Sequence, residues 1–177
     1  MGAFAYRLAG AALLDASVYE GIETDPAATW QAAATVVLSS LAAGLGLSGL
    51  ADFRLATFAL MSAIACATWI AWAMLTLQIG TRMLPESGTK ADLGQLLRTI
   101  GFAAAPGLLQ VFAVLPKMML PIFIGTAVWM LAAMVVAVRQ ALDFRSLGRA
   151  LAVCGMGAGL SIALAIIIGL LFGPTAS

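Results

Sequence analysis

Five long apolar runs without a charged side chain determine what this sequence can fold into. The runs cover residues 28–50, 55–79, 99–115, 118–138 and 150–172. A helix of about 20 apolar residues is long enough to cross the hydrocarbon core of a bilayer. We therefore predict an all-α fold, a polytopic bundle of about five transmembrane helices that forms a single domain over residues 1–177. Residues 1–24 precede the first run, and we expect them to form a short helix on the cytoplasmic surface of the membrane.

The third run is the weakest of the five because it is short and contains Pro106. Proline lacks a backbone donor, and its ring clashes with the carbonyl four residues earlier, which here belongs to Phe102. We expect this span to be broken or kinked at Pro106. A plain structural kink is favoured over a binding site lined by a broken helix. Broken helices or a re-entrant pair are the alternatives for runs three and four, and four spans is the fallback count.

The composition excludes several classes of protein. Charged residues make up 10% of the chain, whereas a soluble domain carries about 25%. The net charge of +1 argues against a nucleic-acid partner, and the absence of histidine excludes His-dependent catalytic, zinc and haem sites. Cys66 and Cys154 lie in apolar runs without the spacing of a disulfide or metal site. We expect no enzymatic activity, no catalytic residue, no metal and no cofactor.

The basic residues between the runs predict the orientation of the chain, because cytoplasmic loops of membrane proteins are enriched in Lys and Arg. With five spans, one side of the membrane receives Arg7, Arg82, Lys90, Arg98, Arg139, Arg145 and Arg149. The other side receives only Arg54 and Lys117. We therefore predict a cytoplasmic N-terminus and an outside C-terminus, in what we expect to be a bacterial cytoplasmic (inner) membrane.

Local signals mark where helices begin and pack. Asp25 followed by Pro26 is typical of an N-cap and a first helical position, so we place the start of the first span there. Thr89 followed by an acid three residues later fits a capping pattern, which predicts an interfacial helix leading into the third span. Gly155 and Gly159 form a G-x-x-x-G, which lets helices approach closely within one chain or in a dimer.

The loop over residues 139–149, RQALDFRSLGR, is the densest charged segment on the predicted cytoplasmic side. If the preceding helix continues through it, Arg139 and Asp143 stand four residues apart and can pair. The other arginines would face lipid headgroups or a partner. The candidate contacts with lipids or a partner are Arg98, Arg139, Gln140, Asp143, Arg145 and Arg149. A solvated loop that only sets the orientation is an equally weighted alternative.

Several strings and their order resemble bacterial members of the Yip family, the Ypt-interacting or Yip-one domain proteins. They are YEGIETDPAATWQA, LLRTIGFAAAPGLL and AVWMLAAMVVAVRQALDF. The positions that match the pattern are Tyr19, Glu20, Asp25, Pro26, Gln31, Arg98, Gly101, Phe102, Pro106, Trp129, Arg139, Gln140 and Asp143. The resemblance implies a bundle of five transmembrane helices without established catalytic activity. Eukaryotic relatives associate with Rab-type GTPases, and only an adaptor-like role is carried over to this chain.

Two functions remain open at this point. The first is a non-enzymatic scaffold, adaptor or accessory subunit whose partners are membrane lipids and other integral membrane proteins or a second copy of itself. The alternative is a small transporter, channel or lipid scramblase for a neutral or apolar solute, built around the break at Pro106.

Overall fold

The structure, a computed structural model, describes residues 2–48, 54–85, 89 and 91–172, with side chains described as far as Ala163 in the last helix. Every regular element in these ranges is a helix. The elements are α1 (Ala3–Ala12), α2 (Ala16–Thr24), α3 (Ala28–Ser48), α4 (Leu55–Gln78), the π-helical turn η1 (Ile79–Met83), α5 (Leu93–Phe102), the 3-10 helix η2 (Ala105–Val114), α6 (Met119–Ala141) and α7 (Leu147–Phe172).

Four helical segments are long and apolar enough to cross a membrane, among the residues that the structure describes. They are α3, α4 continued by η1, α5 continued by η2, and α6. The polytopic helical bundle expected from the sequence is thereby confirmed. Helix α7 coincides with the fifth predicted span, and its described side chains end at Ala163. A fifth crossing, like the orientation of the chain, stays a prediction.

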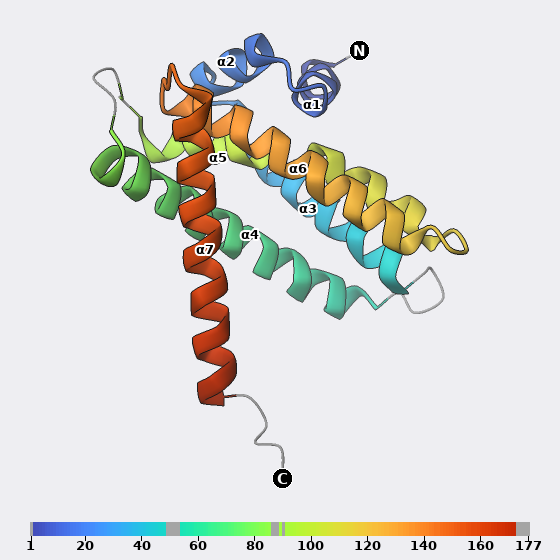
Figure 1. Ribbon diagram of the computed structural model, residues 1–177. Helices are drawn as coiled ribbons and strands as arrows, with labels where there is room; N and C mark the ends of the chain where they lie inside the picture. The colour runs from blue at the N-terminus through green and yellow to red at the C-terminus, as the bar shows by residue number, and fades with distance from the viewer. Residues whose placement is uncertain (1, 49–53, 86–88, 90, 173–177) are drawn as a thin grey trace.

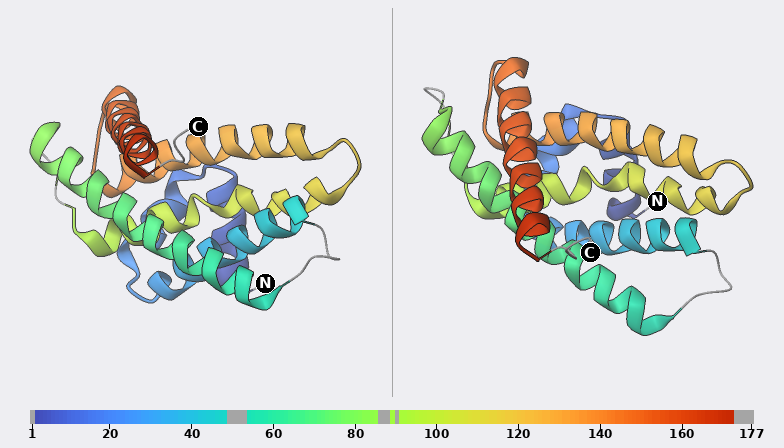
Figure 2. Two further views of the ribbon diagram at one scale, coloured as in Figure 1. Left: turned by 90° about the horizontal axis from the view of Figure 1, so that it is seen from below. Right: turned by 60° about the horizontal axis from the view of Figure 1, so that its bottom comes forward.

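Helices α3 and α6 and the 3-10 helix η2 form a layer, and the other helices pack on its sides and across one end. Helices α3 and α6 run along the two sides of η2, and α4 diverges from this layer (Figures 1 and 2). Helix α7 crosses α4 instead of running alongside α6, and α1 and α2 lie across one end of the layer (Figure 1). The N-terminus therefore lies at the end that carries the two short helices.

Small residues let the elements of this layer approach closely. A Cβ added at Gly46 of α3 would collide with the backbone oxygen of Gln110 in η2, and one at Gly107 would lie 3.2 Å from Ser39. In a membrane, helices associate through such close packing because lipid tails give no hydrophobic driving force between them. The packing of α3 on η2 therefore depends on these glycines.

The break expected at Pro106 is confirmed. Helix α5 ends at Phe102, and the chain resumes as the 3-10 helix η2 with Pro106 in its first turn, fully buried. The hydroxyl of Ser39 donates a hydrogen bond of 2.7 Å to the Ala104 carbonyl in the break. The Ala104 carbonyl also accepts from the Gly107 amide at 2.9 Å, so the Ser39 hydroxyl makes a second bond to it that ties α3 to the break.

The N-terminal segment differs from the single surface helix that we expected over residues 1–24. It forms two helices, because Asp15 caps a new helix by accepting a hydrogen bond from the Ser17 amide at 2.9 Å. Tyr19 and Ile22 of α2 are fully buried against the bundle. The segment is therefore part of the hydrophobic core and covers one end of it.

Two predicted helix ends also need correction. Asp92, and not Thr89, is the N-cap of α5, because its carboxyl accepts from the Gln95 amide at 2.8 Å while the Gln95 side chain accepts from the Asp92 amide. Helix α6 ends at Ala141, and Asp143 adopts a positive φ of 52°. Arg139 therefore does not meet Asp143 at helical spacing, and its Nε donates to the Phe144 carbonyl at 3.3 Å.

The glycines of α7 pack differently from the expectation. A Cβ added at Gly155 or Gly159 would meet nothing within 4 Å, whereas one at Gly157 would lie 3.2 Å from the Trp72 ring of α4. The close contact within the chain therefore uses Gly157, because this residue and Val153 lie on the buried side of α7. A dimer contact through Gly155 and Gly159 stays a prediction.

Candidate functional site

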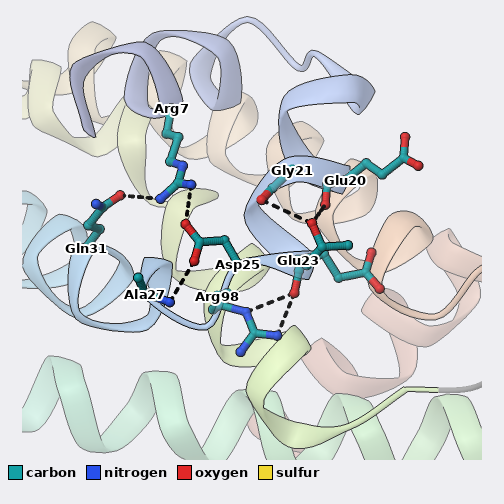
Figure 3. A network of polar contacts seen from close by, with 9 residues as sticks. Arg7, Glu20, Gly21, Glu23, Asp25, Ala27, Gln31 and Arg98 are labelled. Carbon is teal, nitrogen blue, oxygen red and sulfur yellow. Dashed lines mark hydrogen bonds and ion pairs between the residues drawn. The ribbon is translucent and has the colours of Figure 1, made fainter. Parts of the chain in front are cut away.

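The best-defined polar arrangement lies at the end of the bundle covered by α1 and α2 (Figure 3). Arg7 of α1 donates from Nη2 to the Asp25 carboxylate at 2.5 Å and from Nη1 to the Gln31 side chain at 2.9 Å. Asp25 also accepts from the Ala27 amide at 2.9 Å, which caps the start of α3. The Arg7 guanidinium and this amide lower the pKa of Asp25. Arg7 thus joins α1 to the junction between α2 and α3.

Arg98 of α5 makes the second connection. Its Nε and Nη2 donate to the Glu23 carbonyl at 3.0 and 2.5 Å, so the guanidinium caps the last turn of α2. Arg98 is only 8% exposed. We expected it to contact lipids or a partner, and this expectation is wrong, because the side chain is buried under α2 and used inside the bundle.

The Glu23 carboxyl is the most perturbed acid at this end. It is 7% exposed and accepts one hydrogen bond of 3.1 Å from the Gln95 amide nitrogen. Burial, and then the negative charge of Asp143, raise the pKa of Glu23 to about 7, against the opposing effect of the Arg98 charge. Glu23 therefore changes charge near neutral pH.

Aromatic residues of the family pattern anchor the same two helices. Tyr19 is fully buried and donates its hydroxyl to the Ala11 carbonyl at 3.3 Å, and burial raises its pKa. Trp129 of α6 donates from Nε1 to the Ala12 carbonyl at 2.7 Å. Phe102 is fully buried and meets the edge of Phe4, with 6.1 Å between ring centroids. These contacts hold α1 and α2 onto the spans.

Gly101 completes this arrangement by allowing α5 to approach α3. A Cβ added there would lie 2.7 Å from the Ala32 Cβ. Real carbon atoms approach to about 3.5–4.0 Å, so Gly101 is a position where a close approach excludes larger residues. Pro26 begins the turn into α3 and is exposed.

The remaining predicted contact residues lie around the turn between α6 and α7. Arg145, Asp143 and Arg139 are exposed there, and Gln140 is half-buried. Arg149 donates from Nη1 to the Pro85 carbonyl at 2.6 Å, which ties the start of α7 to the segment after η1. Contacts between α2 and α6 place this turn at the same end of the bundle as α2.

Sequence reasoning missed three members of the site: Arg7, Glu23 and Gln95. Arg7 is the only cation before Arg54, so an acid close to it in the fold could have been expected. Gln95 stands three residues after Asp92, which is the spacing of a capping box. The burial of Glu23 has no local sequence signal, because it follows from the docking of α2.

The sides of the bundle carry apolar hollows. One of about 390 Å³ lies between α3, α4, α5 and α6 and is lined by Trp69, Trp72, Ile100, Met130 and Met134 among others. A second, of about 520 Å³, lies between α1, η2 and α6. Their linings are almost entirely apolar, which suits lipid tails better than a polar solute.

The fold and site define an integral membrane protein, a polytopic helical bundle whose N-terminal helices are locked onto one end. The chain belongs to the Yip1 domain family, because the model of the Yip1 domain matches residues 15–172. The match begins at the cap of α2 and ends with α7, so it includes the residues of the polar end described above except Arg7 and the rest of α1. Comparison with curated proteins and with solved structures gave no match.

Proposed function

We propose that this protein is a non-enzymatic scaffold, adaptor or accessory subunit of a membrane protein assembly, located in a bacterial inner membrane. Its docking surface is the end of the bundle formed by α2 and the turn between α6 and α7. One observation carries the proposal. Side chains of the family pattern, among them Arg98, Asp25 and Trp129, form hydrogen bonds within the chain and so hold this end of the bundle in one arrangement. A surface fixed in advance loses less entropy when it binds a partner.

The charges exposed at this end support a protein partner. Asp15, the N-cap of α2, and Glu20 of α2 are exposed, while Arg139 and Arg145 are exposed at the turn between α6 and α7. Asp143 is exposed in the same turn, so the turn carries both signs of charge. Exposed charges steer association and fix the orientation of a partner. The partners that we propose are other integral membrane proteins or a second copy of the chain, within the surrounding lipid.

The region of Pro106 favours this proposal over transport. Pro106 is fully buried, and the Ala104 carbonyl accepts both the Ser39 hydroxyl and the Gly107 amide. After the break, Gln110 of η2 donates a hydrogen bond of 3.1 Å to the Thr126 hydroxyl of α6. These groups are used within the bundle, which supports a structural role for the break.

Site-specific photo-crosslinking in living cells tests the proposal. A photoreactive phenylalanine analogue is introduced in place of Glu20 on α2, Ser146 before α7, or Leu60 on the outer face of α4. All three side chains are exposed, so the substitutions are matched for burial. We expect discrete protein adducts from the first two positions and none from Leu60. Equal adducts from all three positions, or none from the first two, would contradict the docking surface.

A further inference from the structure

The carboxyl of Glu23 lies where a negative charge is unfavourable. Glu23 belongs to the last turn of α2, which spans Ala16–Thr24. The C-terminal end of a helix carries partial negative charge, so a carboxylate there is repelled. The side chain is also withdrawn from solvent, with 7% of its surface exposed. Both conditions favour the neutral form of the acid.

The nearby cation does not bond to this carboxyl. Arg98 directs Nε and Nη2 to the backbone carbonyl of Glu23. Figure 3 shows the Glu23 carboxyl pointing away from that guanidinium. The hydrogen bond that the carboxyl accepts comes from the uncharged amide of Gln95. The guanidinium therefore caps the helix, and its charge only partly offsets that of an ionised Glu23.

The other charged groups that face Glu23 are acids from three elements. Glu20 lies on α2 itself, Asp92 at the start of α5, and Asp143 in the turn after α6. Among the charged groups of the described residues that act on Glu23, Arg98 on α5 is the one that favours its ionised form. An ionised Glu23 thus adds one more negative charge to an acidic surrounding.

The turn that carries Asp143 is fixed by its neighbours. Leu142 is fully buried and Phe144 is 3% exposed, and Asp143 between them has a φ of 52°. Moving Asp143 away from Glu23 would expose one of these apolar side chains. Separation of the two acids therefore requires that α2 moves.

We propose that Glu23 is a proton-dependent latch, which holds α2 on the bundle when its carboxyl is neutral and loosens α2 when the carboxyl ionises beside Asp143. The latch controls the surface of α2 whether or not that surface binds a partner. When α2 is docked, burial and Asp143 raise the pKa of Glu23 to about 7, and when α2 is released the pKa returns toward its ordinary value of 4.5.

The direction of the pH effect follows from these two values. Between pH 4.5 and 7 the docked state keeps a proton that the released state has lost. The docked state is therefore favoured most below pH 4.5 and is progressively weakened as the pH rises to 7. One proton is exchanged, so the equilibrium constant for release rises by up to about tenfold per pH unit within this window.

Hydrogen exchange of the full chain in lipid nanodiscs measures this release. The readout is the protection factor of the amides in α2, corrected for the intrinsic pH dependence of exchange, with the amides of α6 as the reference in the same sample. We expect protection of α2 to fall by up to about tenfold per pH unit from pH 5 to pH 7, and to level off above that. Glu23→Gln keeps the acceptor for Gln95 and should abolish the slope.

Asp143→Asn provides the second variant, in case Glu23→Gln does not fold. Removing the charge of Asp143 should move the upper end of the window to lower pH while leaving the slope below it. A wild-type protein without a slope specific to α2, or a Glu23→Gln protein that retains it, would overturn the latch. An unchanged window in Asp143→Asn would overturn the role of Asp143.

Discussion

Replacing Gly101 by alanine tests the contact between α5 and α3 that supports the polar end of the bundle. The added Cβ would lie 2.7 Å from the Ala32 Cβ and 3.2 Å from the Ala32 backbone, roughly 1 Å closer than the optimum for carbon atoms. Forcing an extra methyl group into a packed interior costs about 1–3 kcal/mol. Alanine also forms helices better than glycine, by about 1 kcal/mol. The net expectation is a loss of up to about 2 kcal/mol of unfolding free energy, and of about 1–3 kcal/mol relative to a glycine-to-alanine change that meets no steric clash.

Gly125→Ala is the matched control. Gly125 lies inside α6, and an added Cβ there would meet nothing within 4 Å. This variant therefore receives the gain in helix propensity without the steric cost, and we expect it to be stabilised by up to about 1 kcal/mol. The assay is denaturant unfolding in detergent micelles, followed by tryptophan fluorescence. If Gly101→Ala proves as stable as Gly125→Ala, the close packing of α5 on α3 is refuted.

Three further predictions concern burial, α1 and topology. Arg98→Lys should lose about 1–3 kcal/mol in the same unfolding assay, because a single ammonium cannot reproduce the two guanidinium bonds to a buried carbonyl; unchanged stability would show that these bonds are dispensable. Trp129→Phe should increase proteolytic cleavage within α1, because the indole bond to the Ala12 carbonyl is lost; equal cleavage would contradict that anchor. In a cysteine-free background, an impermeant maleimide added to intact cells should label Arg54→Cys and spare Ser146→Cys; the reverse pattern would refute the predicted orientation.

The long spans could be predicted from the sequence because an apolar run of membrane length leaves few alternatives to a helix. The runs at residues 28–50, 55–79 and 118–138 correspond to α3, α4 and α6 within a few residues. The break at Pro106 was predictable for a different local reason. Proline lacks a backbone donor and its ring clashes with the preceding turn, whatever the rest of the chain does.

The arrangement at the end of the bundle could not be predicted because it depends on contacts between distant segments. Arg98 carries a full charge and follows a capping signal, so its sequence context resembles that of an exposed residue. Its partner is the Glu23 carbonyl, 75 residues earlier in the chain. Likewise, Gly157 is the packed glycine of α7 because Trp72 of α4 lies opposite to it, and the G-x-x-x-G pattern gives no information on that partner.

Purification from native membranes in mild detergent, with sizing and mass spectrometry, is the most direct test of the proposed adaptor role. The wild-type chain is compared with Glu20→Lys, which reverses an exposed charge on α2, and with Leu60→Ala on the outer face of α4. The account predicts a stoichiometric protein partner or defined homo-oligomer that Glu20→Lys loses and Leu60→Ala retains, at equal thermal stability. A lone chain that moves solutes or lipids across liposomes, unaffected by either substitution, would contradict the adaptor role and support the transporter or scramblase alternative.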